Sequence, residues 1–262
     1  GQMTLGGFAA ALVGLHLAPV PGPWLWLLCV AAAFLAGALW GGIAGALKAR
    51  TGAHEVIVTI LLNFVAVALT NYFLTRFYAL PDSVRTGTIG EGAWMARFSD
   101  AFALFQGSGV STAFPFALLA AVAADLLLLR SPLGFHWRIL GGGIRRAQYA
   151  RLSPARLTFL SMALAGGFAG LASSSFVLGY KHYFEEGFSS GIGYLGIAVA
   201  LLARNRPAAV PLSALLFGFL SQGGLVVNQL VPREVVDLVV AAILFVFIVL
   251  DARGREGAIR WI

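Results

Sequence analysis

The sequence predicts an all-α protein, a polytopic transmembrane helical bundle of about eight spans. Apolar residues make up 59% of the chain and charged residues only 11%, whereas about a quarter of the residues in soluble domains are charged. A helix needs about 20 mostly apolar residues to cross the hydrocarbon core, and this chain supplies that length many times. Since its apolar runs lack the period-2 alternation of barrel strands, we expect helices.

The expected spans follow one another closely along the chain. Pro19, Pro21 and Pro23 separate the first two, and the sixth is short enough for a broken or re-entrant helix. Because no segment is left over for a soluble domain, we expect a single transmembrane domain over residues 1–262. The predicted spans are 3–19, 24–46, 56–78, 113–130, 158–179, 189–203, 207–228 and 235–250.

The charges orient these spans. If Lys48 and Arg50 are cytoplasmic, alternation of eight spans places thirteen of the 18 Lys and Arg residues on the cytoplasmic side and five on the other. The positive-inside rule predicts this asymmetry. Topology and contact with anionic membrane lipid therefore explain the net charge of +7, and we expect no nucleic-acid partner.

Residues 131–157, here called the basic segment, form the most basic connection between spans. The segment is too long for a simple turn and too basic to cross a bilayer readily. We therefore expect it to be a cytoplasmic surface that meets a partner. It contains no acid and five arginines, which are Arg138, Arg145, Arg146, Arg151 and Arg156.

Known catalytic patterns are either incomplete in this chain or lack the structural context in which they act. His54 and Glu55 begin an HExxH zinc motif whose second histidine is missing. Residues 187–191 match GxSxG, but that pattern acts on the strand–turn–helix of a soluble hydrolase. The chain has no GxxxxGK[ST] phosphate loop, so we expect no ATPase site. Cys29 is the single cysteine and gives no disulfide or metal pattern.

Polar residues inside predicted spans are candidates for a transport pathway. Asp125 is the only carboxylate well within a span, and an ion-coupled secondary transporter that uses it is the main alternative function. An intramembrane hydrolase with Ser189 or Ser190 near His182 is a third. Interhelical hydrogen bonding is favoured over solute contact for the uncharged candidates, which are Asn63, Asn71, Gln222 and Asn228.

Glycines recur at helical spacing in two of the spans. Gly37, Gly41 and Gly45 are four residues apart, and Gly166 and Gly170 repeat the interval. Small residues at this spacing let helix backbones approach closely in a bilayer. Routine helix packing is the simpler interpretation, and a seam in a moving transporter core is the other. The similarity of residues 37–47 to 163–172 is a weak indication of an internal repeat.

The segment GALWGGIAGALKARTGAHEVIVTILLNF (37–64) resembles a signature of bacterial ABC-importer permeases in the branched-chain amino acid, ribose and nucleoside class. Residues 138–150, SMALAGGFAGLAS (161–173) and GIAVALLARNRPAAVPLSALLFG (196–218) extend the resemblance over nearly the whole chain. The similarity is closest to the sugar and nucleoside importers that use a binding protein of the basic-membrane-lipoprotein type.

This resemblance implies a multi-pass permease subunit of the bacterial inner membrane, without a cofactor of its own. Its partners would be two ATP-binding subunits, a second homologous permease or another copy of this chain, an extracytoplasmic substrate-binding lipoprotein and membrane lipid. Its small-molecule solute would be a nucleoside or a simple sugar, with a riboflavin-like compound as a variant. From the sequence itself, the long outer loop (79–112) is expected either to face a substrate-delivery protein or only to cap the bundle.

The resemblance also places a short coupling helix, which docks on the ATP-binding subunit, within the basic segment. The family usually has Asn-Pro where this chain has Gly143 and Ile144, and commonly glycine where it has Arg151. Members also carry further spans before the residues that match Gly1–Met3, so we expect N-terminal spans to be missing here. The carried-over coupling residues are Gly141, Arg145, Arg146, Ala147, Tyr149, Ala150, Arg151 and Leu152.

Overall fold

The protein is helical in a computed structural model that describes residues 1–101, 109–189 and 191–227, with positions 235, 238, 241, 242 and 245. Within these residues the only β-type pairings are three isolated antiparallel bridges, so the all-α prediction is confirmed. The chain divides into two compact units. The first comprises residues 1–120 and 127–190, and the second comprises 121–126 and 191–262.

Four of the described helices are long and apolar enough to cross a membrane. They are α2 (Gly22–Thr51), α3 (Glu55–Phe73) with the π-helical turn Leu74–Tyr78, α5 (Ala113–Arg130), and α8 (Pro154–Phe176) with the π-helical turn Val177–Lys181. These helices correspond to the second, third, fourth and fifth predicted spans. The chain therefore has several membrane spans, as the sequence predicts.

The other predicted spans match shorter or less completely described helices. α1 (Gln2–His16) has 15 residues and α9 (Ile192–Leu202) has 11, both below the length that crosses a bilayer without tilt or thinning. α10 (Val210–Val227) follows the 3-10 turn Pro207–Ala209 and has 18 residues. Most of the predicted span 235–250 lies outside the described residues. The total of eight spans therefore stays a prediction.

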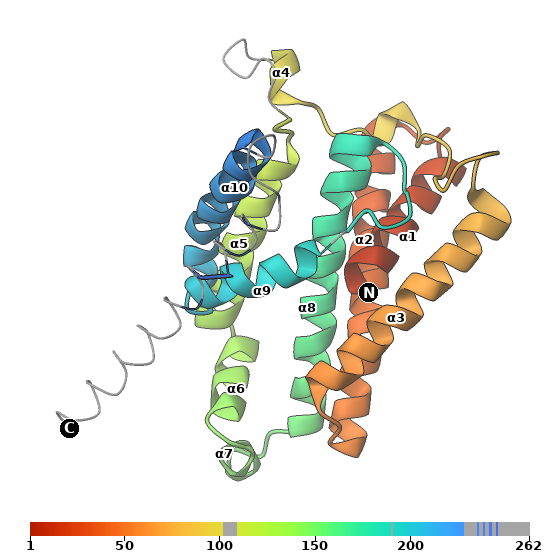
Figure 1. The fold of residues 1–262 in the computed structure, drawn as a ribbon. Coiled ribbons are helices and arrows are strands. Elements are labelled where there is room, and N and C mark those ends of the chain that lie inside the picture. The colour runs from red at the N-terminus through yellow and green to blue at the C-terminus, as the bar shows by residue number, and fades with distance from the viewer. Residues whose placement is uncertain are drawn as a thin grey trace. The chain divides into compact units, whose positions relative to one another are not determined.

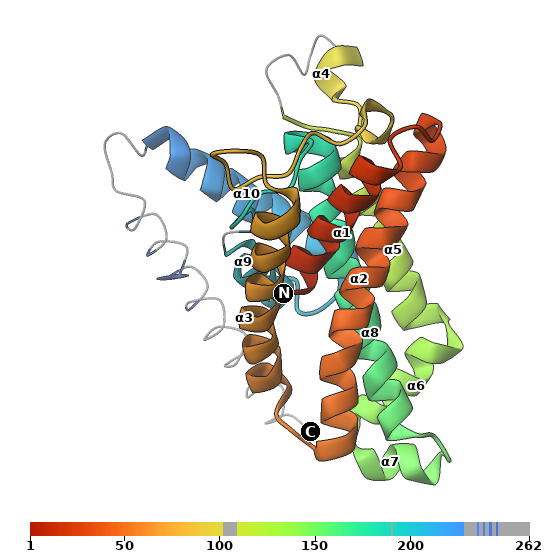
Figure 2. The same cartoon turned by 90° about the vertical axis from the view of Figure 1, so that its right-hand side faces the viewer.

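Glycines bring α1, α2 and α8 of the first unit into backbone contact (Figures 1 and 2). A Cβ atom added to Gly37 would overlap the carbonyl oxygen of Gly166, and one added to Gly41 would overlap that of Met162. On α1, a Cβ on Gly6 would lie 2.6 Å from the Gly170 Cα. We call Gly37, Gly41, Gly166 and Gly170 the glycine seam. The close backbone approach predicted for these glycines is confirmed, whereas movement along the seam stays a prediction.

Main-chain hydrogen bonds join the described part of the outer loop to the end of α8 and to the residues that follow it. The amide nitrogen of Thr86 donates to the Phe184 carbonyl (2.8 Å), that of Ile89 to His182 (2.9 Å) and that of Met95 to Leu178 (2.9 Å). Two short helices lie in this loop, η2 (Glu91–Ala93) and α4 (Phe98–Ala101). Ile89 and Met95 are buried in the core of the first unit. This part of the loop therefore caps the helices.

The second unit contains α9 and α10, which pack on each other. Phe217 of α10 is buried against Ala198 and Val199 of α9. The turn between the helices contains two residues with positive φ, Arg204 (53°) and Asn205 (54°). This left-handed turn lets the chain reverse direction and pack α10 back on α9.

Candidate functional site

The basic segment folds into two short helices followed by the start of α8. α6 spans Pro132–Gly141 and α7 spans Ile144–Tyr149. Ser131 begins α6, because its side-chain oxygen accepts a hydrogen bond from the Gly134 amide (3.0 Å) and Pro132 takes the first helical position. Both views place these helices at the end of the first unit opposite the outer loop (Figures 1 and 2). The basic segment is therefore an ordered helical element.

Two side chains of α6 hold this element against its neighbours. The indole nitrogen of Trp137 donates to the Leu157 carbonyl in the first turn of α8 (3.0 Å). The Arg138 guanidinium donates to the carbonyl oxygens of Leu128 and Leu129, the latter at 3.2 Å. Arg138 thus satisfies carbonyls that the end of α5 leaves unpaired. It is a structural residue, and the basic character of the segment alone did not reveal this role.

A glycine sets the direction in which α7 begins. Gly143 precedes α7 with φ +129° and ψ 146°, a conformation that a side chain would strain. The Ala147 side chain is fully buried, and its carbonyl accepts a hydrogen bond from the Leu152 amide (2.9 Å). One face of this short helix is therefore fixed against the unit.

The exposed surface of α7 combines apolar with basic side chains. Tyr149 is 90% exposed and Ile144 is 62% exposed. Arg145 and Arg146 are also exposed. Tyr and Arg are the side chains that protein interfaces favour. An anchored helix with this face has the properties of a docking element.

The structure distributes the eight predicted coupling residues over three environments. Ala147 is buried and Leu152 is half-buried, so both support the helix from beneath. The other six are exposed and lie on or beside α7: Gly141, Arg145, Arg146, Tyr149, Ala150 and Arg151. Their contact with a partner stays a prediction.

Arg151 occupies a backbone conformation that suits glycine. Its φ is +55°, and a left-handed conformation costs a residue with a Cβ about 1–2 kcal/mol. Its amide donates to the Gln148 carbonyl (3.0 Å) and closes the end of α7. The glycine that the resemblance leads one to expect at this position would therefore fit the turn without strain.

We expect Arg151→Gly to stabilise the protein by up to about 1 kcal/mol, because glycine adopts positive φ without strain. The matched variant Gln148→Gly, one turn earlier inside α7, should destabilise it by about 1 kcal/mol. Thermal unfolding of the two purified variants measures both effects. A lower melting temperature for Arg151→Gly than for the wild type would contradict the assignment of the strain to this turn.

The candidate pathway residues fall on different elements. Asn63 and Asn71 lie on α3, where the Asn63 side-chain oxygen accepts from the Gly1 nitrogen (2.5 Å) and the Asn71 amide donates to Glu186 (2.5 Å). Glu186 lies in a turn after α8 rather than in a helix, so interhelical hydrogen bonding by these amides stays a prediction. Gln222 is exposed on α10 in the second unit, and Asn228 lies outside the described residues. Solute contact by these residues stays a prediction.

Trp40 is a polar group near this pathway region that the sequence did not single out. Its indole nitrogen is buried and has no hydrogen-bond partner among the described residues. A Cβ atom added to Gly1 would lie 3.0 Å from this indole nitrogen and 3.0 Å from the Cβ of Ala66 on α3. A tryptophan in a predicted span carries no pattern that distinguishes it from a packing residue, so only the structure identifies this donor.

The structure also places the residues proposed for an ion-coupled carrier and for an intramembrane hydrolase. Asp125 is half-buried on α5, and the described part of the chain shows no ion pair to it. Within the same described part, no hydrogen bond joins Ser189 to His182, and Ser190 lies outside it. His182 instead stacks on Trp94, with ring centroids 4.2 Å apart and planes 20° apart. The geometry gives no support to a serine–histidine pair.

The environment of His182 predicts that the stability of the folded protein depends on pH. Burial, and next the positive charge of Arg97, lower the pKa of the His182 imidazole from its ordinary value. An unfolded histidine binds a proton below pH about 6.5, so the unfolded state takes up more protons than the folded state as the pH falls below that value. The contribution of neutral His182 to the free energy of unfolding is therefore fully present above about pH 6.5. It decreases as the pH falls towards the lowered pKa of the folded state.

We expect acidification from about pH 7.5 to about pH 5.5 to lower the melting temperature more in the wild type than in His182→Asn. Asparagine suits the position because His182 has φ +61°, a conformation that asparagine tolerates. Thermal unfolding at both pH values measures the difference. Equal pH dependence in the two proteins would show that the titrating group lies elsewhere.

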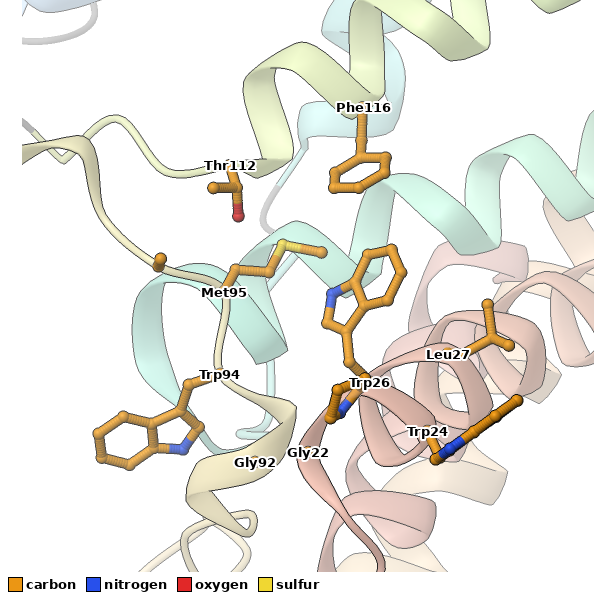
Figure 3. A pocket seen from close by; sticks show the side chains of 11 residues that line it. Gly22, Trp24, Trp26, Leu27, Gly92, Trp94, Met95, Thr112 and Phe116 are labelled. Carbon is orange, nitrogen blue, oxygen red and sulfur yellow. The ribbon is translucent and has the colours of Figure 1, made fainter. Parts of the chain in front are cut away.

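A pocket of about 620 Å³ lies where α2 begins, beside the outer loop and the start of α5 (Figure 3). Its lining is mostly apolar and aromatic, and the rings of Trp26 and Phe116 are 4.9 Å apart. Trp24 is 65% exposed and Trp94 is 42% exposed. Aromatic residues collect in this way at membrane–water interfaces, which agrees with a position at the end of the spans.

The membrane-length apolar helices define an integral membrane protein. Comparison with known proteins identifies its family. The family described as "branched-chain amino acid transport system / permease component" matches residues 1–249. The chain belongs to this family of ABC-transporter permeases, which are integral proteins of the cell membrane.

Named relatives cover most of the chain. It is 39% identical over 255 residues to the guanosine ABC transporter permease protein NupP of Bacillus subtilis. This alignment covers 93% of this chain and 70% of NupP. It is 30% identical to the nucleoside permease protein NupB of Lactococcus lactis (94% and 69% covered) and 31% identical to the glucose permease protein TsgB13 of Haloferax volcanii (95% and 67%). No solved structure matches the chain.

Proposed function

We propose that this chain is the permease subunit of an ATP-driven importer for a nucleoside or a simple sugar. The observation that carries the proposal is the anchored helix α7, whose exposed Tyr149 and arginines form a docking face. The family membership supports an ABC transporter, in which separate ATP-binding subunits supply the energy.

The names of the relatives support the solute class. Two carry nucleoside or guanosine in their names, and a third carries glucose. These solutes are neutral and rich in hydroxyl groups, so amides, hydroxyls and aromatic faces suffice to bind them. We propose Asn63 and the free indole nitrogen of Trp40 as candidates for such contacts. We rank a nucleoside before a riboflavin-like solute.

Force reaches the spans through rigid contacts in the proposed mechanism. A partner that moves α7 also moves α8, because Trp137 binds the first turn of α8 and Ala147 is buried beneath α7. α8 in turn contacts α2 backbone to backbone along the glycine seam. Closely packed interiors transmit displacement with little slack. Closure of the ATP-binding subunits would thus be converted into a rearrangement of helices around the solute.

The proposed assembly contains this chain as one permease domain over residues 1–262. Its partners are two ATP-binding subunits, a second permease or another copy of this chain, and an extracytoplasmic substrate-binding lipoprotein. The exposed surface of the outer loop is the proposed contact for the lipoprotein. The chain itself would carry no cofactor and no ATPase site.

The solute class is tested by competition for uptake in cells that express the whole importer. We expect uptake of labelled guanosine to be reduced at least about tenfold by excess unlabelled purine nucleoside and unaffected by riboflavin. Cells without this chain provide the baseline. Uptake of riboflavin that excess nucleoside does not reduce would show that the solute is riboflavin-like. The assignment of the chain as a permease subunit would still hold.

A further inference from the structure

A groove of about 420 Å³ lies between the C-terminal end of α2 and the N-terminal end of α8, and we call it the α2–α8 groove. Both helices belong to the first unit and are long enough to span a membrane. Two arginines and five apolar side chains line it: Arg50, Arg156, Ala46, Ala49, Ala155, Phe159 and Leu160. The groove is therefore basic and apolar at once.

The two arginines carry positive charge that no described residue neutralises. The nearby Lys48 forms an ion pair with Glu55 (2.6 Å), so the Glu55 carboxylate is already paired. Arg50 and Arg156 are exposed, and the described residues include no hydrogen-bond or ion-pair partner for either guanidinium. Arg156 also lies in the first turn of α8, where the helix dipole is positive and favours an anion.

The groove changes from charged to apolar along the helices. Phe159 and Leu160 follow Arg156 by three and four residues, so they lie on the same face of α8 one turn nearer its middle. Ala46 precedes Arg50 by four residues and is placed in the same way on α2. One turn of helix is about 5.4 Å. Charge at the mouth with apolar walls beneath matches a phospholipid, whose phosphate sits above its acyl chains.

We propose that the α2–α8 groove binds an anionic phospholipid. The headgroup phosphate lies between the guanidinium groups of Arg50 and Arg156, which bind phosphate with paired N–H donors. One acyl chain passes along Phe159, which is 42% exposed, and Leu160, which is 38% exposed. The ends of spans face the headgroup region, where anionic lipid attracts basic residues. The inference does not depend on which solute the permease moves.

Native mass spectrometry of the purified transporter tests the lipid site, with phosphatidylglycerol and phosphatidylcholine as probes. We expect the wild type to retain phosphatidylglycerol in preference to phosphatidylcholine. The variant Arg50→Gln/Arg156→Gln should bind phosphatidylglycerol at least about tenfold more weakly, since each basic residue near the surface contributes about 1 kcal/mol. Equal retention of both lipids by the wild type would overturn the proposal without any variant.

The matched control is Arg145→Gln/Arg146→Gln, which removes the same charge from α7. It should retain the lipid, and an equal loss would show that total charge rather than the groove binds it. Arg50→Lys/Arg156→Lys keeps the charge and should retain most of the binding. Soluble glycerol phosphate should not displace the lipid, because the apolar wall contributes to its affinity. Displacement would identify a site for free phosphate and overturn the lipid assignment.

Discussion

Tyr149→Asp combined with Ala150→Asp is expected to abolish co-purification of the ATP-binding subunits with this chain. Tyr149 is 90% exposed at the end of α7 and Ala150 is also exposed, so the fold does not require either side chain. Loss of a central tyrosine typically costs an interface about 2 kcal/mol or more, and the added carboxylates increase that loss. We expect binding to fall at least about thirtyfold, measured by affinity purification of the tagged chain from membranes.

The control for this variant is Thr88→Asp. It adds a carboxylate to an exposed position of the outer loop, outside the basic segment. The ATP-binding subunits should remain bound to it, and both proteins should unfold at the temperature of the wild type. Retention of these subunits by the α7 variant would show that docking occurs elsewhere.

Gly37→Leu is expected to have the largest effect on stability. A Cβ atom there would overlap the Gly166 carbonyl and lie 3.0 Å from the Gly170 Cα, so neighbouring backbone rather than a flexible side chain would have to move. α2 and α8 would separate and lose their contact along the glycine seam. Overpacking costs about 1–3 kcal/mol and occasionally more, and we expect a loss of about 3 kcal/mol in the free energy of unfolding.

The matched substitution is Gly141→Leu. A Cβ on Gly141, at the end of α6, would meet no atom within 4 Å. This variant should be as stable as the wild type or slightly more stable, since leucine favours the helix. Denaturant unfolding in detergent compares the two. Equal stabilities for Gly37→Leu and Gly141→Leu would contradict the role assigned to the glycine seam.

The fold class and the long spans could be predicted because apolar length is a direct physical requirement of the bilayer. The glycine repeats likewise indicated close packing, although only the structure shows that Gly37 meets Gly166. Helix ends were less predictable. The π-helical turn Val177–Lys181 carries α8 beyond the predicted end of its span, because hydrogen-bond geometry decides where a helix stops and hydropathy does not.

The short exposed helix of the basic segment was predictable, but its contacts with the rest of the chain were not, and docking there stays a prediction. The arginines of this segment marked a surface, yet the structure shows that Arg138 caps α5 and that Arg151 adopts positive φ. Trp137 and its bond to Leu157 join positions 20 residues apart, a pairing that no local pattern encodes. Polar residues such as Asn71 gave the weakest signal, since packing and solute binding use the same amides.

Uptake by reconstituted vesicles shows whether ATP or an ion gradient drives this permease. The chain would be reconstituted with its ATP-binding subunits and lipoprotein, with ATP on the side of the ATP-binding subunits and labelled nucleoside on the other. We expect uptake that requires hydrolysable ATP, is insensitive to collapse of ion gradients and persists in Asp125→Asn. Uptake driven by an ion gradient without ATP-binding subunits, and lost in Asp125→Asn, would contradict this expectation and identify an ion-coupled carrier.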